Sequence, residues 1–304
     1  MHMKPFRVRA LLGVVLLGSL AAAMAAPLPT NDNERRCWSK YTRERTQTRQ
    51  TELTSVDFSN LRDSYQVASP LLVEFAVRGM GVAPAGKELK GTGHHHILVD
   101  TRMPLDVTDK LPFNDKHRHF GKGQTSTLLD LPPGKHTLRL LFADHEHRPY
   151  FVYSKEISVE VLGQRSAVPR PKIVATNFDA TCAAWYQDEV SRPRPPDEPL
   201  YFANVRADEA LTSPFSLRLG VDAFGVCARG QTAEKTGFFM LEVLNRDDRK
   251  PVQNFDLSNG ATQANVFVGV GTYLLRLRFV DPASGADLLR PHELPVSVAQ
   301  QDRF

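Results

Sequence analysis

After position 26 the sequence contains no apolar run long enough for a transmembrane helix, which needs about 20 residues. An excess of positive charge is also missing. The formal net charge of +4 includes three basic residues within the first nine positions, so the rest of the chain is close to neutral. Nucleic-acid-binding proteins usually carry a concentrated basic face. We therefore expect neither a membrane span nor a nucleic-acid partner.

The first 26 residues have the composition of a secretory signal peptide. Basic residues precede an apolar run over 11–20, and Ala23-Met24-Ala25 supplies a cleavage site with small residues. A basic region, an apolar core and a small-residue site in this order are typical of exported proteins. We expect cleavage near Ala25-Ala26 and a mature protein that is periplasmic or secreted.

The rest of the chain contains an internal repeat. Residues 56–70 align with 200–214, and after a length change of seven residues 132–145 align with 269–282. A repeat of this length indicates a duplicated domain. We predict four parts: a signal peptide (1–26), a His-rich first domain (27–163), a linker (164–176) and a degenerate second domain (177–304).

Short alternating segments predict the fold class. Apolar and polar residues alternate over 73–77, 136–142 and 157–161, and the second copy repeats each pattern. The 21 prolines and 19 glycines favour turns over long helices. We predict an all-β protein of two tandem immunoglobulin-like β-sandwich domains with little helix. The charged stretch 43–52 lacks an apolar period, so we expect it to be solvated chain.

Cysteine is scarce, with only Cys37, Cys182 and Cys227. Their spacing matches no thiolate zinc motif, and an odd number cannot pair completely within one chain. Disulfides persist in exported proteins. We predict the bond Cys182–Cys227, because both residues lie in the second copy and Ala83 stands at the position of Cys227 in the first. A bond between Cys37 and Cys182 is the alternative, since it would join equivalent positions near the starts of the two copies.

Histidine is concentrated in the first copy, where eight of the ten histidines lie between positions 94 and 147. Imidazole titrates near neutral pH and is the commonest metal ligand in proteins. Nitrogen ligands suit Zn²⁺ and Cu²⁺. Three His-x-His pairs supply the candidate ligands for a transition metal, Cu or Zn: His94, His96, His117, His119, His145 and His147.

The second copy indicates which way these side chains point. Phe238-Phe239-Met240 replaces His94-His95-His96, so the fold does not need histidine there. Phe239 belongs to an apolar alternating face, which predicts that His95 points inward. His94 and His96 then point outward, because successive side chains on a strand alternate. Alternate residues lie about 7 Å apart along a strand, so this pair can chelate one ion.

Other residues are candidates for supporting the ligands. Metal-bound imidazoles usually hydrogen-bond a second partner through their other ring nitrogen. Possible second-sphere residues of this kind in the first copy are His95, His136, Asp100, Asp144 and Gln124.

Four motifs in order carry a family resemblance. They are Gly-x-Gly-His-His-His (91–96), His-Phe-Gly-x-Gly-Gln-Thr (119–125), Pro-Gly-x-His-Thr-Leu (133–138) and Asp-x-x-His (144–147). Over about 69–161 the chain resembles a bacterial family known as domain of unknown function 4399. The resemblance implies an exported domain with these histidines as its signature, and it brings no activity or ligand. The second copy departs from every signature histidine.

Three classes of function remain open. The leading hypothesis is an exported binding protein that holds a transition metal in its first domain. The alternative is a cell-envelope or glycan-binding module without metal, in which Gln124, Phe113 and Tyr150 line a polar groove and the partner is an envelope protein or a glycan. A metal-dependent hydrolase is the third, with an open position that activates water. The sequence shows no nucleophile elbow or evident base, which argues against an enzyme.

Overall fold

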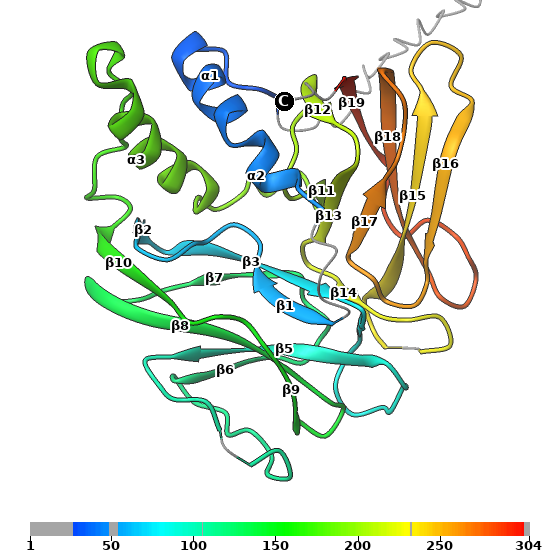
Figure 1. Ribbon diagram of the computed structural model, residues 1–304. Helices are drawn as coiled ribbons and strands as arrows, with labels where there is room; N and C mark the ends of the chain where they lie inside the picture. Colours follow the sequence, from blue (N-terminus) through cyan, green and yellow to red (C-terminus); the bar gives the residue numbers. More distant parts are fainter. Residues whose placement is uncertain (1–26, 49–53, 105, 232, 301–304) are drawn as a thin grey trace, which may run out of the picture.

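The computed structural model describes residues 27–48, 54–104, 106–231 and 233–300 (Figure 1). The expected signal peptide, residues 1–26, lies outside this described part. Among the helices of the described residues, none is long and apolar enough to cross a membrane.

The first half is a sandwich of two β-sheets. One sheet has the strand order β1-β3-β7, and the other has the order β2-β10-β8-β5-β4, with β6 paired to β5 and β9 paired to β8. The strands are β1 (Ser55–Phe58), β2 (Tyr65–Ser69), β3 (Leu71–Arg78), β4 (Gly81–Val82), β5 (Thr92–Val99), β6 (His117–Phe120), β7 (Ser126–Leu129), β8 (Gly134–Ala143), β9 (Pro149–Tyr153) and β10 (Ile157–Gln164).

The second half repeats this arrangement. Its sheets have the orders β11-β13-β17 and β12-β19-β18-β15-β14, with β16 paired to β15. The strands are β11 (Leu200–Phe202), β12 (Glu209–Thr212), β13 (Phe215–Val221), β14 (Gly225–Val226), β15 (Thr236–Asn245), β16 (Pro251–Leu257), β17 (Gln263–Val266), β18 (Gly271–Val280) and β19 (His292–Ala299). The prediction of two tandem immunoglobulin-like β-sandwiches is confirmed.

Equivalent strands pair in the same register. In the first half, His95 of β5 lies opposite Phe142 of β8, and β6 pairs with the other edge of β5. In the second half, Phe239 of β15 lies opposite Phe279 of β18, and β16 takes the place of β6. Each of β5 and β15 is therefore a central strand with neighbours on both sides, which accounts for its extensive burial.

Helices precede the two sandwiches and lie together on one side of the molecule (Figure 1). They are α1 (Asp32–Lys40), α2 (Thr42–Thr46), the short 3-10 helix η1 (Ala175–Asn177) and α3 (Phe178–Val190). α1 begins after Asn31, whose side-chain oxygen accepts the N–H groups of Asn33 and Glu34. The expectation that 43–52 is solvated chain is wrong for its first part. Arg45 is buried in α2 and forms an ion pair with Glu209 at 2.5 Å, so the second half covers this segment.

The predicted disulfide Cys182–Cys227 is wrong. The bond joins Cys37 of α1 to Cys182 of α3, with 5.5 Å between the Cα atoms. These two helices pack against each other through a buried cluster that includes Trp38, Trp185 and both cysteines, which brings the equivalent positions of the two copies together. Cys227 follows β14 and is buried as a free thiol.

Candidate metal centre

The pleat of β5 separates its three histidines into two groups. The His95 ring lies in the sandwich core, with ring centroids 4.8 Å from Phe75 and 4.9 Å from Phe142. His94 and His96 lie on the opposite face, where their Nε2 atoms are 3.0 Å apart. The second copy predicts this alternation. The outward face is not open to solvent, however, because both side chains are fully buried.

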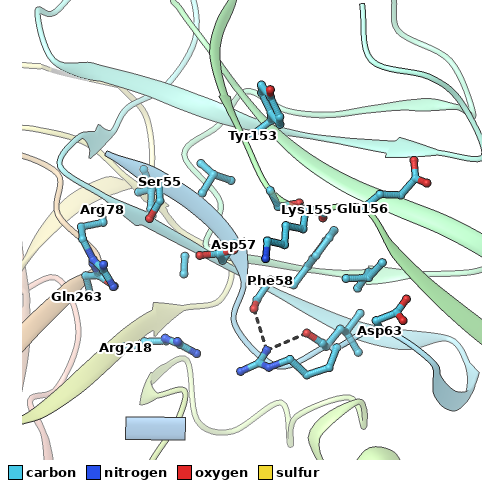
Figure 2. A pocket seen from close by; sticks show the side chains of 17 residues that line it. Ser55, Asp57, Phe58, Asp63, Arg78, Tyr153, Lys155, Glu156, Arg218 and Gln263 are labelled. Atoms are coloured by element: carbon cyan, nitrogen blue, oxygen red, sulfur yellow. Dashed lines mark hydrogen bonds between the residues drawn. The ribbon is translucent and has the colours of Figure 1, made fainter. Parts of the chain in front are cut away.

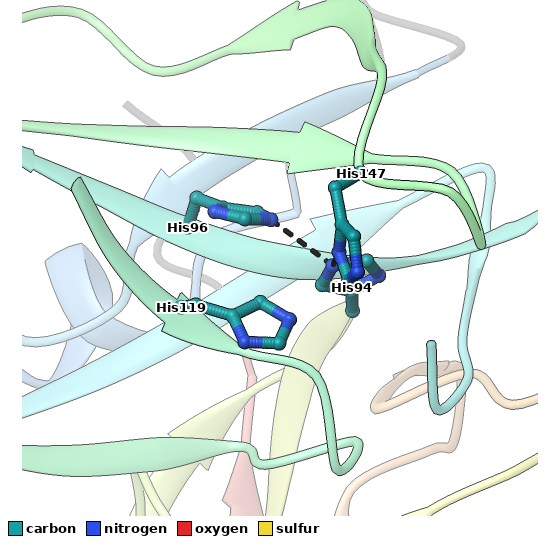
Figure 3. A group of neighbouring side chains, drawn as sticks. All are labelled: His94, His96, His119 and His147. Carbon is teal, nitrogen blue, oxygen red and sulfur yellow. Dashed lines mark hydrogen bonds between the residues drawn. The ribbon is translucent and has the colours of Figure 1, made fainter. Parts of the chain in front are cut away.

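Two further histidines complete a cluster on that face (Figure 3). His119 enters from β6, where the antiparallel register places it directly opposite His96. His147 enters from the turn between β8 and β9, and its Nδ1 atom lies 3.1 Å from Nε2 of His94. The Asp144 side chain holds this turn by accepting the backbone N–H groups of Glu146 and Arg148. One ligand atom from each of the four histidines lies within 4.8 Å of all the others.

Hydrogen bonds account for only part of this convergence. A neutral imidazole has one N–H donor and one acceptor nitrogen. Nε2 of His94 faces ring nitrogens of both His96 and His147, yet it can make a full hydrogen bond with only one of them. Nε2 of His119 is buried and has no hydrogen-bond partner among the described residues. A buried polar atom without a partner costs about 1–3 kcal/mol, so the cluster is costly without a ligand.

Burial keeps the four imidazoles in the neutral form. The pKa of His94 falls to about 3 and that of His96 to about 2, first because burial disfavours the charged ring and then because neighbouring histidines repel a second positive charge. Burial also lowers the pKa values of His119 and His147. Neutral imidazole is the form that binds a metal ion.

The spacing of the ring nitrogens fits one ion. Two nitrogens at about 2.0–2.1 Å from a shared ion lie about 3.3 Å apart in a tetrahedral site and at most about 4.2 Å apart. The separations of 3.1 Å and 3.0 Å around His94 are close to the tetrahedral value. The widest separation of 4.8 Å requires the outer rings to move inward by several tenths of an ångström. The donor set is all nitrogen, which suits Zn²⁺ and Cu²⁺.

Two predicted ligands do not join this cluster. His117 lies on β6 opposite Leu98, and its Nδ1 atom is 3.1 Å from the side-chain oxygen of Asn114. His145 lies in the same turn as His147, and its backbone carbonyl accepts the N–H of Gly86. Each of the two His-x-His pairs outside β5 therefore contributes one histidine to the cluster. The other member of each pair, His117 or His145, lies in a different environment.

Within the described part of the chain, no side chain of the predicted supporting residues hydrogen-bonds the imidazole of any of the four histidines. The ring of His136, near the start of β8, lies 2.7 Å from the Asp100 carboxylate. Gln124 accepts the backbone N–H of Lys122 in the turn after β6, and Asp144 holds its own turn. His95 belongs to the core. None of these side chains therefore orients an imidazole of the cluster through a hydrogen bond.

Two residues that contact the clustered histidines were not predicted to do so. Phe113 stacks on His119 with ring centroids 4.5 Å apart and meets the His147 ring edge-on at 4.8 Å, so it covers the outer side of the cluster. The sequence marked Phe113 only as a groove-lining aromatic. Gly121 lies under the His119 ring, where an added Cβ would come within 2.2 Å of Nε2. Its position two residues after His119 was the available signal.

A cavity elsewhere in the molecule does not involve the candidate ligands. Figure 2 shows this cavity of about 370 Å³, which lies beside β1 and is lined by residues of both halves, including Asp57, Arg78 and Arg218. The guanidinium group of Arg62 at its edge donates to the backbone carbonyls of Phe58 and Leu61. Its lining mixes both signs of charge and contains no histidine.

A known family model matches part of the first half. Residues 73–162 match the model of a family described as Domain of unknown function (DUF4399). The matched segment contains all four clustered histidines, and the family resemblance predicted from the motifs is confirmed. No curated protein matches the chain.

Several solved structures show weak likeness to the chain. CopC from Methylosinus trichosporium OB3b is 13% identical, covers 32% of this chain and 89% of its own, and has a TM-score of 0.20. The fibronectin(III)-like modules of Clostridium thermocellum CbhA are 8% identical, with coverages of 81% and 94% and a TM-score of 0.22. A two-domain fibronectin type-III segment of chicken tenascin is 10% identical, with coverages of 80% and 98% and a TM-score of 0.19. TM-scores this low carry no argument about the site.

Proposed function

We propose that this protein is an exported binding protein whose first half holds one Cu²⁺ or Zn²⁺ ion. The ligands are His94, His96, His119 and His147. The observation that carries the proposal is the convergence of four neutral, largely buried imidazoles whose donor atoms lie within 4.8 Å of one another. A cluster with lowered pKa values is more often a functional site than a structural one.

The choice of metal follows from the donor atoms. No thiolate or carboxylate belongs to the four-residue group. Imidazole suits Zn²⁺, Cu²⁺ and Ni²⁺, whereas Mg²⁺ and Ca²⁺ prefer oxygen ligands. Among the divalent ions of the first transition row, Cu²⁺ generally forms the most stable complexes with such sites. We therefore expect Cu²⁺ to bind more tightly than Zn²⁺.

The proposed location outside the cytoplasm rests on two observations. The first 26 residues have the composition of a signal peptide. The disulfide Cys37–Cys182 is of a kind that persists in oxidising compartments and is rare in the cytosol. A periplasmic or secreted protein accommodates both.

Calorimetric titration of the mature chain, purified without a His-tag, tests the metal-binding proposal. We expect one equivalent of Cu²⁺ or Zn²⁺ to bind tightly at neutral pH. Ca²⁺ serves as the control and should give no heat of binding, because it avoids nitrogen ligands. The absence of tight binding by either transition metal would refute the proposal.

A further inference from the structure

The two halves contact each other through equivalent backbone groups. The N–H of Val226 in β14 donates to the carbonyl of Gly123 at 2.7 Å, and the N–H of Val82 in β4 donates to the carbonyl of Gly260 at 2.8 Å. Val82 and Val226 occupy the same position in the two copies, as do Gly123 and Gly260. Each half therefore presses a short strand against a turn of the other half, as in a two-fold symmetric dimer.

These contacts are close enough to require glycine. A Cβ at Gly225 would lie 1.7 Å from the carbonyl oxygen of Lys122, and a Cβ at Gly81 would lie 1.9 Å from that of Asn259. Thr125 adds a side-chain contact, because its Oγ1 atom lies 3.1 Å from the N–H nitrogen and 3.3 Å from the carbonyl oxygen of Val221. The second half thus holds the turn formed by 121–125, directly after β6.

The same turn supports a candidate ligand. The His119 ring rests on Gly121, which has no side chain to displace it. The carbonyl of Gly121 accepts the N–H of Ala85 at 2.9 Å, and the next residue, Gly86, donates to the carbonyl of His145 at 2.8 Å. The turn after β6 is therefore tied both to the second half and to the turn that carries His147.

The corresponding turn of the second half supports no histidine. Ser258 stands at the position of Gly121, and Asp256 stands at the position of His119. The contact between the halves is thus duplicated, but only one of its two copies lies beneath an imidazole.

We propose that the second half positions His119 for metal binding by clamping the turn 121–125 through β14. This inference rests on the proposed metal site and assigns a role to the half that lost its histidines. A ligand must be held within about 0.5 Å of its productive place, so a clamp on the turn beneath it affects affinity. Changes to groups that support metal ligands typically cost about 10–100-fold in affinity.

A matched pair of substitutions in the full chain tests the clamp. Gly225→Ala pushes against Lys122, and Gly81→Ala pushes against Asn259 at the equivalent contact. In both variants the turn should yield, because β14 and β4 are hydrogen-bonded to β15 and β5 in their own sheets. We expect Gly225→Ala to weaken Cu²⁺ binding at least about tenfold. Gly81→Ala should bind within about threefold of wild type, with a similar fall in melting temperature.

A spectroscopic readout separates positioning from general destabilisation. The Cu²⁺ complex of Gly225→Ala should show one nitrogen ligand fewer than wild type by electron paramagnetic resonance, whereas the Gly81→Ala complex should match wild type. Wild-type affinity in Gly225→Ala, or equal losses in both variants, would overturn the inference. Failure of the wild-type chain to bind metal would instead refute the proposed function.

A milder pair keeps the test available if either alanine variant does not fold. Thr125→Val removes the hydroxyl that contacts Val221, and Thr262→Val makes the same change at the equivalent position in the second half. We expect the first to weaken Cu²⁺ binding by several fold and the second to leave it unchanged. Equal affinities in these two variants would also overturn the inference.

Discussion

Strands β5 and β15 occupy the same place in two sandwiches of the same topology, yet they carry different chemistry. The first presents His94, His95 and His96, and the second presents Phe238-Phe239-Met240. Both strands are paired on each side, and His95 and Phe239 are both buried in the core. The apolar version shows that this position folds well without any imidazole.

The difference has an energetic meaning. Burying a polar ring costs free energy unless its nitrogens find partners, and His95 has none for either nitrogen within the described structure. The first half therefore accepts a cost that the second half avoids. A metal ion bound to the cluster would give Nε2 of His119 a partner and so offset part of that cost, whereas His95 lies in the core on the opposite face of β5 and outside the cluster.

The largest expected effect is on metal binding. His94→Ala and His96→Ala should each reduce Cu²⁺ affinity by at least about a hundredfold, because each removes one of four ligands from a buried site. His95→Phe is the matched control and should bind normally, because Phe239 already fills the equivalent core position. Calorimetric titration of the three variants checks this. Lost binding in His95→Phe with normal binding in His94→Ala would show that the faces of β5 are wrongly assigned.

Acid should lower the stability of the first half more than that of the second, because the first half contains more buried histidines. The pKa of His95 is lowered by burial to about 3, as is that of His94, whereas an unfolded histidine titrates near 6.5. Below pH 6.5 the unfolded chain therefore binds more protons than the folded chain, and stability falls until the pH reaches the folded pKa values. One such histidine lowers the free energy of unfolding by up to about 5 kcal/mol as the pH falls from 6.5 to 3, because each pKa unit is worth about 1.4 kcal/mol.

Denaturant unfolding of the metal-free chain between pH 7.5 and 4 measures this effect. We expect a steep loss of the free energy of unfolding below pH 6.5, and a shallower loss in His95→Phe, which has one proton-binding group fewer. The second half also contains a buried histidine, His292, whose pKa burial lowers to about 4. His292→Phe should also reduce the slope of the free energy of unfolding against pH, because it removes one of several histidines that take up a proton on unfolding. A stability that does not change with pH over this range would contradict the assigned burial.

The sequence predicted the sandwiches and the faces of β5 because both depend on local alternation. An apolar period of two, repeated in two copies, defines strands and their inner sides without any tertiary information. The disulfide depended instead on how the helices α1 and α3 pack against each other. No local pattern places Cys37 beside Cys182, so the presence of Cys182 and Cys227 in the same copy favoured the wrong pair.

The candidate ligands show the same limit. His94 and His96 follow from alternation on one strand, and His119 follows from an antiparallel partner. His147 joins the cluster from a turn with a positive φ of 71°, while His145 in the same turn does not. The His-x-His pattern does not distinguish the two members of a pair, so it does not show which of them is the ligand. Only the three-dimensional path of the turn decides which imidazole reaches the others.

At neutral pH, His95→Phe should stabilise the chain by giving the core of the first half the phenylalanine that the second half has at this position. The substitution removes two buried nitrogens that have no hydrogen-bond partner and keeps a ring between Phe75 and Phe142. We expect a gain of about 1–3 kcal/mol in the free energy of unfolding. Denaturant titration at pH 7.5 measures it. A loss of stability would indicate that His95 has a polar role in the core.

The smallest effects should come from the histidines outside the cluster. His117→Ala and His145→Ala should change Cu²⁺ affinity by less than about threefold, whereas His119→Ala and His147→Ala should lower it at least about tenfold. The four variants form two matched pairs, each two residues apart on one segment. Similar losses within either pair would show that the ligand set is larger than the four clustered histidines.

X-ray absorption at the metal edge of the fully loaded chain tests the central claim most directly. One equivalent of Cu²⁺ or Zn²⁺ should show four imidazole nitrogens at about 2.0–2.1 Å, which is the distance expected for such ligands. Sulfur in the first shell, or a shell dominated by oxygen, would contradict a site built from His94, His96, His119 and His147.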